Sequence, residues 1–249
     1  MKPIQAIPAA LSAIVLALAA GSADAQVANG NFNGLTGWST DGDAAAAPNG
    51  GSHLVLTNAY PDSGIDADDT DGIDRNVSGN APVFTGGGAG TGSLEDFLGL
   101  PADALNVSRS LQAFEGSAAM QTFTAVGGSR LSFQWNLATA EAPDATAPDV
   151  AFVVIDGQLI TLGNTLSATN ALSGGDYVAQ TGWTNWSTTL TGSGSHTIAF
   201  GVVDVGSFTD SSELLVTGVS AVPESSTLAM FGAGVGLLAA LQRHRRRKA

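Results

Sequence analysis

Residues 131–137 read Leu-Ser-Phe-Gln-Trp-Asn-Leu, and apolar and polar side chains alternate at every position. Successive side chains of a β-strand point to opposite faces of the sheet, so a period of two indicates one buried and one polar face. An amphipathic helix would repeat its apolar residues every three or four positions instead. This stretch therefore predicts a half-buried strand and favours a sheet-based fold.

Strand-like segments of the same kind lie on both sides of it. Residues 150–156 are almost continuously apolar, which favours a central strand, and Asp156-Gly157 then predicts a tight hairpin. A single short helix is expected after the N-cap residue Ser93, ending before Pro101. Further strands are expected over residues 53–58, 117–124, 158–162, 187–190, 196–204 and 213–219, the last of which closes the sheet.

Short strands separated by glycine turns, with almost no helix, predict an all-β fold: an antiparallel two-sheet sandwich of jelly-roll-like type. Phe32 and Trp38 follow an Asn/Gly-rich opening and are expected to plug one end of the sandwich. The Gly-rich residues 85–93 lack the Lys-Ser/Thr of a phosphate loop and are interpreted as a flexible linker.

The N-terminus has the pattern of a signal peptide over residues 1–25. Lys2 precedes an apolar run over residues 9–20, and Ala23-Asp24-Ala25 forms an A-x-A cleavage site. We expect cleavage between Ala25 and Gln26, which leaves residues 26–221 as a single β-sandwich ectodomain.

The C-terminal residues 222–249 combine three features in order. They are a short Pro-Glu motif, an apolar uncharged run over residues 227–241, and a basic tail. The run predicts a transmembrane helix that is short for a bilayer, and the basic cluster after it predicts a cytoplasmic tail. The motif comprises Val222, Pro223, Glu224, Ser225 and Ser226, and the cytoplasmic anchor comprises Arg243, Arg245, Arg246, Arg247 and Lys248.

This C-terminal segment resembles the PEP-CTERM sorting domain, although Ser225 stands where a second proline is usual. The resemblance implies an exosortase-like processing enzyme as a partner in a Gram-negative bacterium. It implies export through the inner membrane, anchoring by the C-terminal helix, and delivery to the cell surface or extracellular matrix. Parts of the ectodomain, including residues 115–118 and 133–136, resemble a recurring ectodomain of PEP-CTERM proteins from which no activity follows.

The predicted ectodomain is strongly acidic. It retains only Arg75, Arg109 and Arg130 of the nine basic residues but twenty of the twenty-two acidic ones, which gives three minus twenty, or −17. Binding to a phosphate backbone needs basic residues, so nucleic acid is excluded as a partner.

The chain contains no cysteine, so packing or a metal has to stabilise an exported domain without disulfides. Acidic side chains at strand ends and loops suggest a structural calcium site, because calcium takes oxygen ligands. The alternative is that these acids line exposed loops. The candidate ligands are Glu141, Asp149, Asp204 and Asp210.

Two tryptophans are candidates for stacking on sugar rings, Trp183 and Trp186, which the sequence places in a loop-like setting. The alternative is that they belong to the core, as aromatic residues of sandwiches usually do. The ectodomain has only two histidines, His53 and His196, and no nucleophile or metalloprotease motif, so no enzyme is expected.

These patterns predict an exported protein of the cell envelope or matrix, sorted by a PEP-CTERM/exosortase-like system, with a structural or adhesive role in exopolysaccharide. A carbohydrate-binding module is the alternative. A cryptic glycan hydrolase, using two of the many carboxylates, is third.

Overall fold

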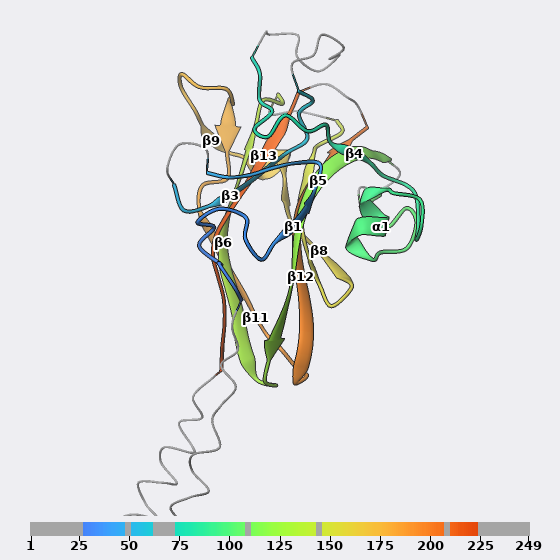
Figure 1. Cartoon of the computed structure of the whole chain (residues 1–249). Helices are drawn as coiled ribbons and strands as arrows, with labels where there is room; N and C mark the ends of the chain where they lie inside the picture. The colour runs from blue at the N-terminus through green and yellow to red at the C-terminus, as the bar shows by residue number, and fades with distance from the viewer. Residues whose placement is uncertain are drawn as a thin grey trace, which may run out of the picture.

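Two antiparallel sheets face each other in the computed structural model, which describes residues 27–47, 51–61, 73–107, 111–142, 146–206 and 210–223 (Figure 1). In order, the first sheet contains β1 (Ser39–Asp41), β5 (Ala113–Ala125), β12 (Gly194–Val205), β7 (Val150–Ile155) and β8 (Gln158–Asn164), with β4 (Val83–Phe84) paired to β5. The second contains β2 (Asp43–Ala46), β3 (Leu54–Thr57), β13 (Ser212–Pro223), β6 (Ser129–Thr139), β10 (Ala179–Gln180) and β9 (Asn170–Ala171), with β11 (Thr184–Thr189) paired to β6. The predicted two-sheet antiparallel sandwich is confirmed.

The core lies between the sheets, and the alternating stretch supplies much of it. Leu131, Phe133, Trp135 and Leu137 of β6 are all buried, as the period of two predicts. The Phe133 ring meets the Phe200 ring of β12 edge-to-face, with 4.8 Å between ring centroids. Each such side chain contributes roughly 1.5–3 kcal/mol by leaving water.

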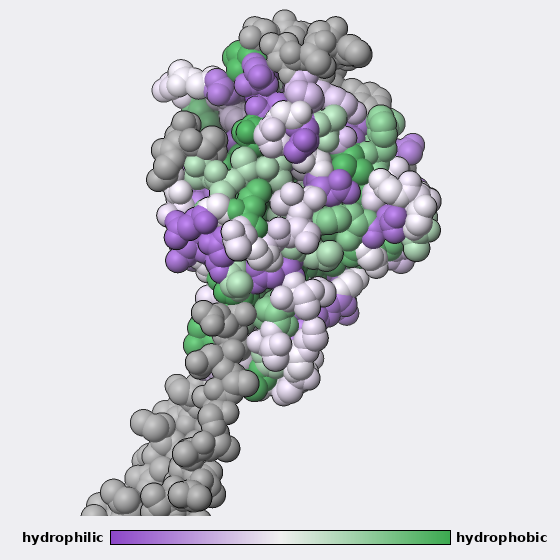
Figure 2. All heavy atoms as spheres, in the orientation of Figure 1, coloured by the Kyte–Doolittle hydropathy of each residue, from purple (hydrophilic) through white to green (hydrophobic). Residues whose placement is uncertain are grey.

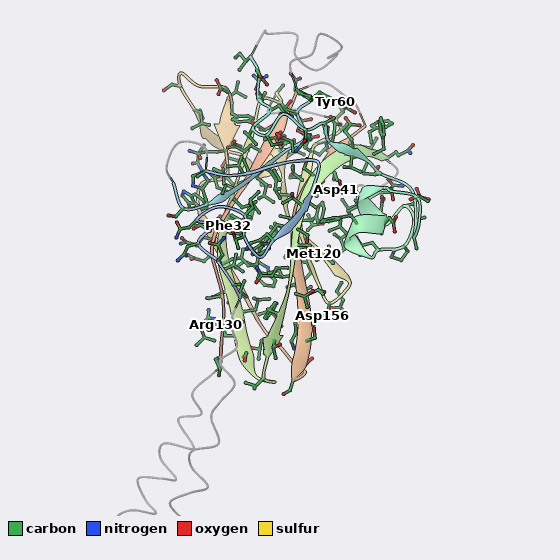
Figure 3. The ribbon with its side chains drawn as sticks, in the orientation of Figure 1. Phe32, Asp41, Tyr60, Met120, Arg130 and Asp156 are labelled. Atoms are coloured by element: carbon green, nitrogen blue, oxygen red, sulfur yellow. The ribbon has the colours of Figure 1, made fainter. Side chains whose placement is uncertain are left out.

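The N-terminal turn closes one end of this core. Phe32 is almost fully buried, and its ring centroid lies 4.9 Å from that of Trp38 (Figure 3). The Trp38 ring in turn lies 5.9 Å from the Phe200 ring. The prediction that Phe32 and Trp38 plug the sandwich is confirmed.

A second apolar cluster covers the outside of the first sheet, where α1 (Leu94–Leu98) packs beside the sandwich (Figure 1). The predicted N-cap is present, because the Ser93 side chain accepts a hydrogen bond from the backbone N–H of Asp96. Gly99 ends the helix with a left-handed φ of 68°, before Pro101, as predicted. A 3-10 turn over Thr165–Ser167 is the other helical element of the described chain.

The predicted hairpin and central strand are both present in the first sheet. Asp156 and Gly157 have φ values of 50° and 77°, which suit a tight two-residue turn between β7 and β8. All of β7 is buried, and it lies between β12 and β8.

The last predicted strand is present and is longer than residues 213–219. β13 lies inside the second sheet, between β3 and β6, and it runs to Pro223. Its register with β6 shifts between Thr217 and Ser220, where Gly218 has a φ of 64°. Sheet position is set by pairing with segments far away in the chain, which the local pattern of residues 213–219 does not contain.

The predicted signal peptide, the motif residues Glu224, Ser225 and Ser226, the C-terminal helix and the basic tail lie outside the described residues. Val222 and Pro223 are described, and they form the end of β13. Within the described residues, no helix has the length and apolar character needed to cross a membrane. Figure 2 shows hydrophilic and hydrophobic residues interspersed over the coloured part of the visible face.

Candidate functional site

The outer face of the second sheet turns away from the core, and its residues can be identified from the strand register. Leu56, Leu214 and Leu137 are paired neighbours in the core, so the residues next to them in each strand point outward. One outward row is Asp43, Thr57, Glu213, Ala138 and Gln180. The next rows are Ala45, Val55, Leu215 and Asn136, then Thr217, Gln134 and Asn185.

Trp183 is the most prominent aromatic side chain of this face. It immediately precedes β11, and 48% of its surface is exposed. Its ring meets the His53 ring edge-on at 6.2 Å between centroids. Burial lowers the pKa of His53, so the imidazole is neutral near pH 7 and offers one donor and one acceptor. An exposed indole packed beside a neighbouring ring offers a flat apolar surface.

Amide and hydroxyl side chains lie on the strands next to this indole. Asn136 Nδ2 donates to Gln180 Oε1 at 2.7 Å, and Thr181 Oγ1 donates to Asn136 Oδ1 at 3.1 Å. Gln134 Nε2 donates to Asn185 Oδ1 at 3.0 Å. These bonds orient the amides, and each amide keeps further donor and acceptor capacity. Gln134 and Asn185 are exposed, so together with Trp183 they can contact both the apolar face and the hydroxyl groups of a sugar.

Trp186 occupies the opposite side of the same strand. It stacks on Phe133 with 4.9 Å between centroids and 21° between ring planes, and it packs against the core. It lies within β11 rather than in a loop. The two tryptophans therefore do not form one platform: Trp183 remains a candidate for sugar contact, whereas the alternative core assignment holds for Trp186. The sequence already indicated that the two side chains point to opposite faces, because residues three apart in a strand do so.

The acidic end of the outer face holds two carboxylates in very different settings. The Asp43 carboxylate accepts hydrogen bonds from the backbone N–H groups of Val77 and Ser78 and from the hydroxyls of Ser78 and Thr57. Even so, burial raises the pKa of Asp43. The Glu213 carboxylate, two strands away, accepts no hydrogen bond from any described residue, and burial, with the charges of Asp176 and Asp43, raises its pKa to about 7.

The candidate calcium ligands approach one another, but their oxygens are largely used by the protein. Asp149 is buried, and its carboxylate accepts bonds from Asn58 Nδ2 at 2.8 Å, Ser212 Oγ at 2.6 Å and the Val205 N–H at 3.2 Å. Its own N–H donates to Glu141 Oε2 at 3.3 Å. Burial raises the pKa of Asp149 well above its usual range, and the nearby charges of Asp204 and Glu141 add to the rise.

The other two candidates differ in exposure, since Asp204 is buried and Asp210 is exposed. Burial also raises the pKa of Glu141, with a further contribution from the charge of Asp210. Over the described ranges, no three or more His, Cys, Asp or Glu side chains are arranged to hold a metal ion. The calcium site stays a prediction.

The second histidine is engaged in a structural pair. His196 Nδ1 lies 2.7 Å from Asp156 Oδ2, and Nε2 lies 3.2 Å from the Gly192 carbonyl oxygen. Asp156 also accepts the Thr197 N–H at 2.9 Å. Since both ring nitrogens have partners, the pair ties the β7–β8 hairpin to the start of β12 at the lower end of the sandwich (Figure 3).

A cavity of about 590 Å³ lies between the N-terminal turn and the end of β13. Val27, two residues after the predicted signal cleavage, and Val222, the first residue of the predicted sorting motif, both line it. The Val219 N–H donates to the Gly30 carbonyl at 2.9 Å, and a Cβ on Gly30 would come within 1.9 Å of the Val219 oxygen. The two ends of the described chain are therefore close together.

Comparison with known proteins gives no family assignment. No family model matches the chain. No curated protein matches its sequence. Among solved structures, it is similar to a carbohydrate-binding module, TmCBM61 in complex with beta-1,4-galactotriose, at 9% identity and a TM-score of 0.36, covering 80% of this chain and 99% of that one.

It is also similar to the cleaved adhesin domain of Lys-gingipain from Porphyromonas gingivalis, at 14% identity and a TM-score of 0.40, covering 79% and 98% of the two chains. A third similar structure is the enzymatically active domain of a bacteriophage CBA120 tailspike protein, at 12% identity and a TM-score of 0.30, covering 79% of this chain and 21% of that one. At such low TM-scores these likenesses carry no argument about ligand or activity.

Proposed function

We propose that this chain is an exported, non-enzymatic protein of the cell envelope or matrix that adheres to polysaccharide through the outer face of its second sheet. The observation that carries the proposal is Trp183, whose indole is half-exposed next to the His53 ring, on the sheet face that also bears the exposed amides of Gln134 and Asn185. Aromatic side chains combine a large apolar contact area with few rotatable bonds, which suits them to binding surfaces.

The sequence supports the proposed location. The signal-peptide pattern of residues 1–25 and the motif, apolar run and basic tail of residues 222–249 favour export and C-terminal anchoring through a PEP-CTERM/exosortase-like route. On this route an exosortase-like enzyme processes the chain within its C-terminal segment.

The binding proposal is tested by titrating the purified full-length chain with a panel of soluble oligosaccharides in a calorimeter. We expect at least one saturable ligand, and Trp183→Ala should weaken it at least ten-fold while the unfolding midpoint stays unchanged. Trp186→Phe preserves the stack on Phe133 and serves as the matched control, which should bind like the wild type. Equal binding by Trp183→Ala and wild type would remove Trp183 from the site.

Location is tested by fractionating a Gram-negative host that expresses the full chain or a chain ending at Pro223. This end point keeps β13 complete. We expect the full chain in the membrane fraction and the shortened chain in the periplasm or medium. A shortened chain that still sediments with membranes would contradict anchoring by the C-terminal segment.

A further inference from the structure

We infer that the ligand of the outer face carries amino groups: Glu213 and Tyr177 form a subsite for the ammonium group of an amino sugar, beside the Trp183 surface. The inference rests on the proposed function and narrows its ligand to polysaccharides with free, protonated amines.

Glu213 is the first part of this subsite. Its side chain is half-buried in the centre of the second sheet, and no described residue donates a hydrogen bond to it or forms an ion pair with it. Asp43, in the same row of the same face, receives bonds from three residues. Asp43 is therefore satisfied within the fold, whereas Glu213 lacks the donors that a partly buried carboxylate needs.

Tyr177 supplies an independent observation. Its hydroxyl oxygen is buried and has no hydrogen-bond partner among the described residues. The backbone places Tyr177 next to Glu213: the N–H of Val178 donates to the Thr139 carbonyl oxygen at 2.9 Å, and the residue before Thr139, Ala138, pairs with Glu213. Burial raises the pKa of Tyr177, and the charge of Glu213 adds to the rise. A buried hydroxyl without a partner is uncommon in folded proteins.

The neighbouring cation is directed elsewhere. Arg75 Nε donates to the Asp176 carbonyl oxygen at 2.6 Å, and its guanidinium lies 5.7 Å from the centre of the Tyr177 ring. It thereby fixes the ring without pairing with Glu213. An unpaired carboxylate and an unpaired phenol oxygen, close to Asp43 and Asp176, together accept hydrogen bonds from a donor-rich cation, and an ammonium group carries three donors.

The spacing suits an oligosaccharide. Glu213 pairs with Ala138 of β6, and Trp183 lies one strand beyond β6 and one residue before β11. Strands lie about 4.8 Å apart and each residue rises about 3.4 Å, so the two positions are about 12 Å apart on one face. A chain of a few sugar rings bridges that separation, with one ring on the indole and an amine at Glu213.

The overall charge favours the same ligand class. The only two lysines of the chain, Lys2 and Lys248, lie outside the predicted ectodomain, whose formal charge is −17. Such a field repels uronic-acid or sulfated polysaccharides and attracts cationic ones.

The test compares two probes that differ in one group: β-1,4-linked glucosamine oligomers and their fully N-acetylated counterparts. Both are titrated against the full-length chain at 0.15 M salt. We expect the amine form to bind at least ten-fold tighter, and Glu213→Gln to abolish this preference while binding of the acetylated form remains. Tyr177→Phe should reduce the preference in the same direction.

Asp103→Asn is the matched charge control, because Asp103 is an exposed acid near the α1 side of the molecule and its positive φ suits asparagine. It should keep the full preference. An equal loss in Asp103→Asn and Glu213→Gln would overturn the subsite in favour of a general charge effect. Equal binding of both probes, lost in Trp183→Ala, would overturn the amine inference alone. Binding of neither probe would overturn it too, and the proposed function would then rest on the oligosaccharide panel.

Discussion

Asp43 fastens the segment after residue 73 to the second sheet. It is fully buried, and its carboxylate accepts the Val77 N–H at 2.9 Å and the Ser78 N–H at 2.8 Å. Replacing it with alanine leaves these donors and the Thr57 hydroxyl unsatisfied. We expect Asp43→Ala to lower the free energy of unfolding by about 2–4 kcal/mol, since each buried unsatisfied group costs about 1–3 kcal/mol. Urea unfolding measures this loss. Asp41→Asn, at a half-buried neighbouring residue, is the control and should lower the free energy of unfolding far less. Equal losses in the two variants would contradict the role given to Asp43.

Glu213 makes a pH-dependent contribution to the free energy of unfolding. Its pKa rises from 4.5 to about 7 in the folded protein, so the native state binds a proton more tightly than the unfolded state. The contribution is present below about pH 4.5 and is lost as the pH rises through about 7. We expect Glu213→Gln to increase stability at pH 8 by about 2–3 kcal/mol and to change it little at pH 4.5. Urea midpoints at the two pH values measure this, and a gain of equal size at both would contradict a titration effect.

The close contact between β12 and β7 requires glycine at one position of β12. Gly201 pairs with Phe152, and a Cβ at Gly201 would come within 2.2 Å of the Phe152 ring, which is itself fully buried. We expect Gly201→Ala to cost about 2–3 kcal/mol, the usual range for overpacking a core. Gly175→Ala is the matched control, because a Cβ at Gly175 would have no atom within 4 Å and the φ of this residue is not positive. Thermal unfolding distinguishes the two, and a neutral Gly201→Ala would show that the Phe152 ring can move aside.

The loop before α1 is anchored by hydrogen bonds, which its glycine content does not predict. The glycines predict a flexible linker over residues 85–93, but the Gly86 N–H donates to the Glu95 carboxylate, and the Gly90 and Gly92 N–H groups donate to Asp96. Glu95 and Asp96, the two acids in the first turn of the helix, are thus the partners that hold the loop. A linker and an anchored loop have similar glycine content, and only the folded contacts separate them.

Prediction from the sequence succeeds where local periodicity decides structure. The alternation of residues 131–137, the Asp156-Gly157 hairpin and the Ser93 cap each depend on neighbours within a few residues. The central position of β13 does not, because its partners β3 and β6 are distant in the chain. For the same reason the sequence predicts only part of the candidate site: it indicates Trp183, but the approach of Glu213 to Tyr177 requires the assembled sheet.

At the scale of the whole molecule, five buried or half-buried carboxylates act together. Burial raises the pKa values of Asp41, Asp43, Glu141, Asp149 and Glu213. All five shifts have the same sign, so each lowers stability as the pH rises above the unfolded pKa, and the net negative charge adds repulsion. We expect the free energy of unfolding to be larger near pH 5 than at pH 8.

Salt should reduce this difference. Raising NaCl from 0.01 M to 0.5 M shortens the screening length from about 30 Å to a few ångströms, which weakens repulsion between surface acids. We expect a gain of about 1 kcal/mol or more at pH 8 and a smaller gain at pH 5, where more carboxyls are protonated. Urea unfolding at the four conditions measures it, and an equal gain at both pH values would indicate a general salt effect on apolar burial.

A chain held at its C-terminal end would transmit tension to the sandwich through β13. This strand is bonded to β3 on one side and to β6 on the other, and its pairing with β6 continues to Pro223. Antiparallel hydrogen bonds run perpendicular to the strands, so a pull along β13 loads many of them at once in shear, whereas a pull on an edge strand peels them apart singly. A domain that is tethered at this end and binds a polymer through the outer face of its second sheet should therefore resist unfolding by drag in flowing water far better than a domain pulled through an edge strand.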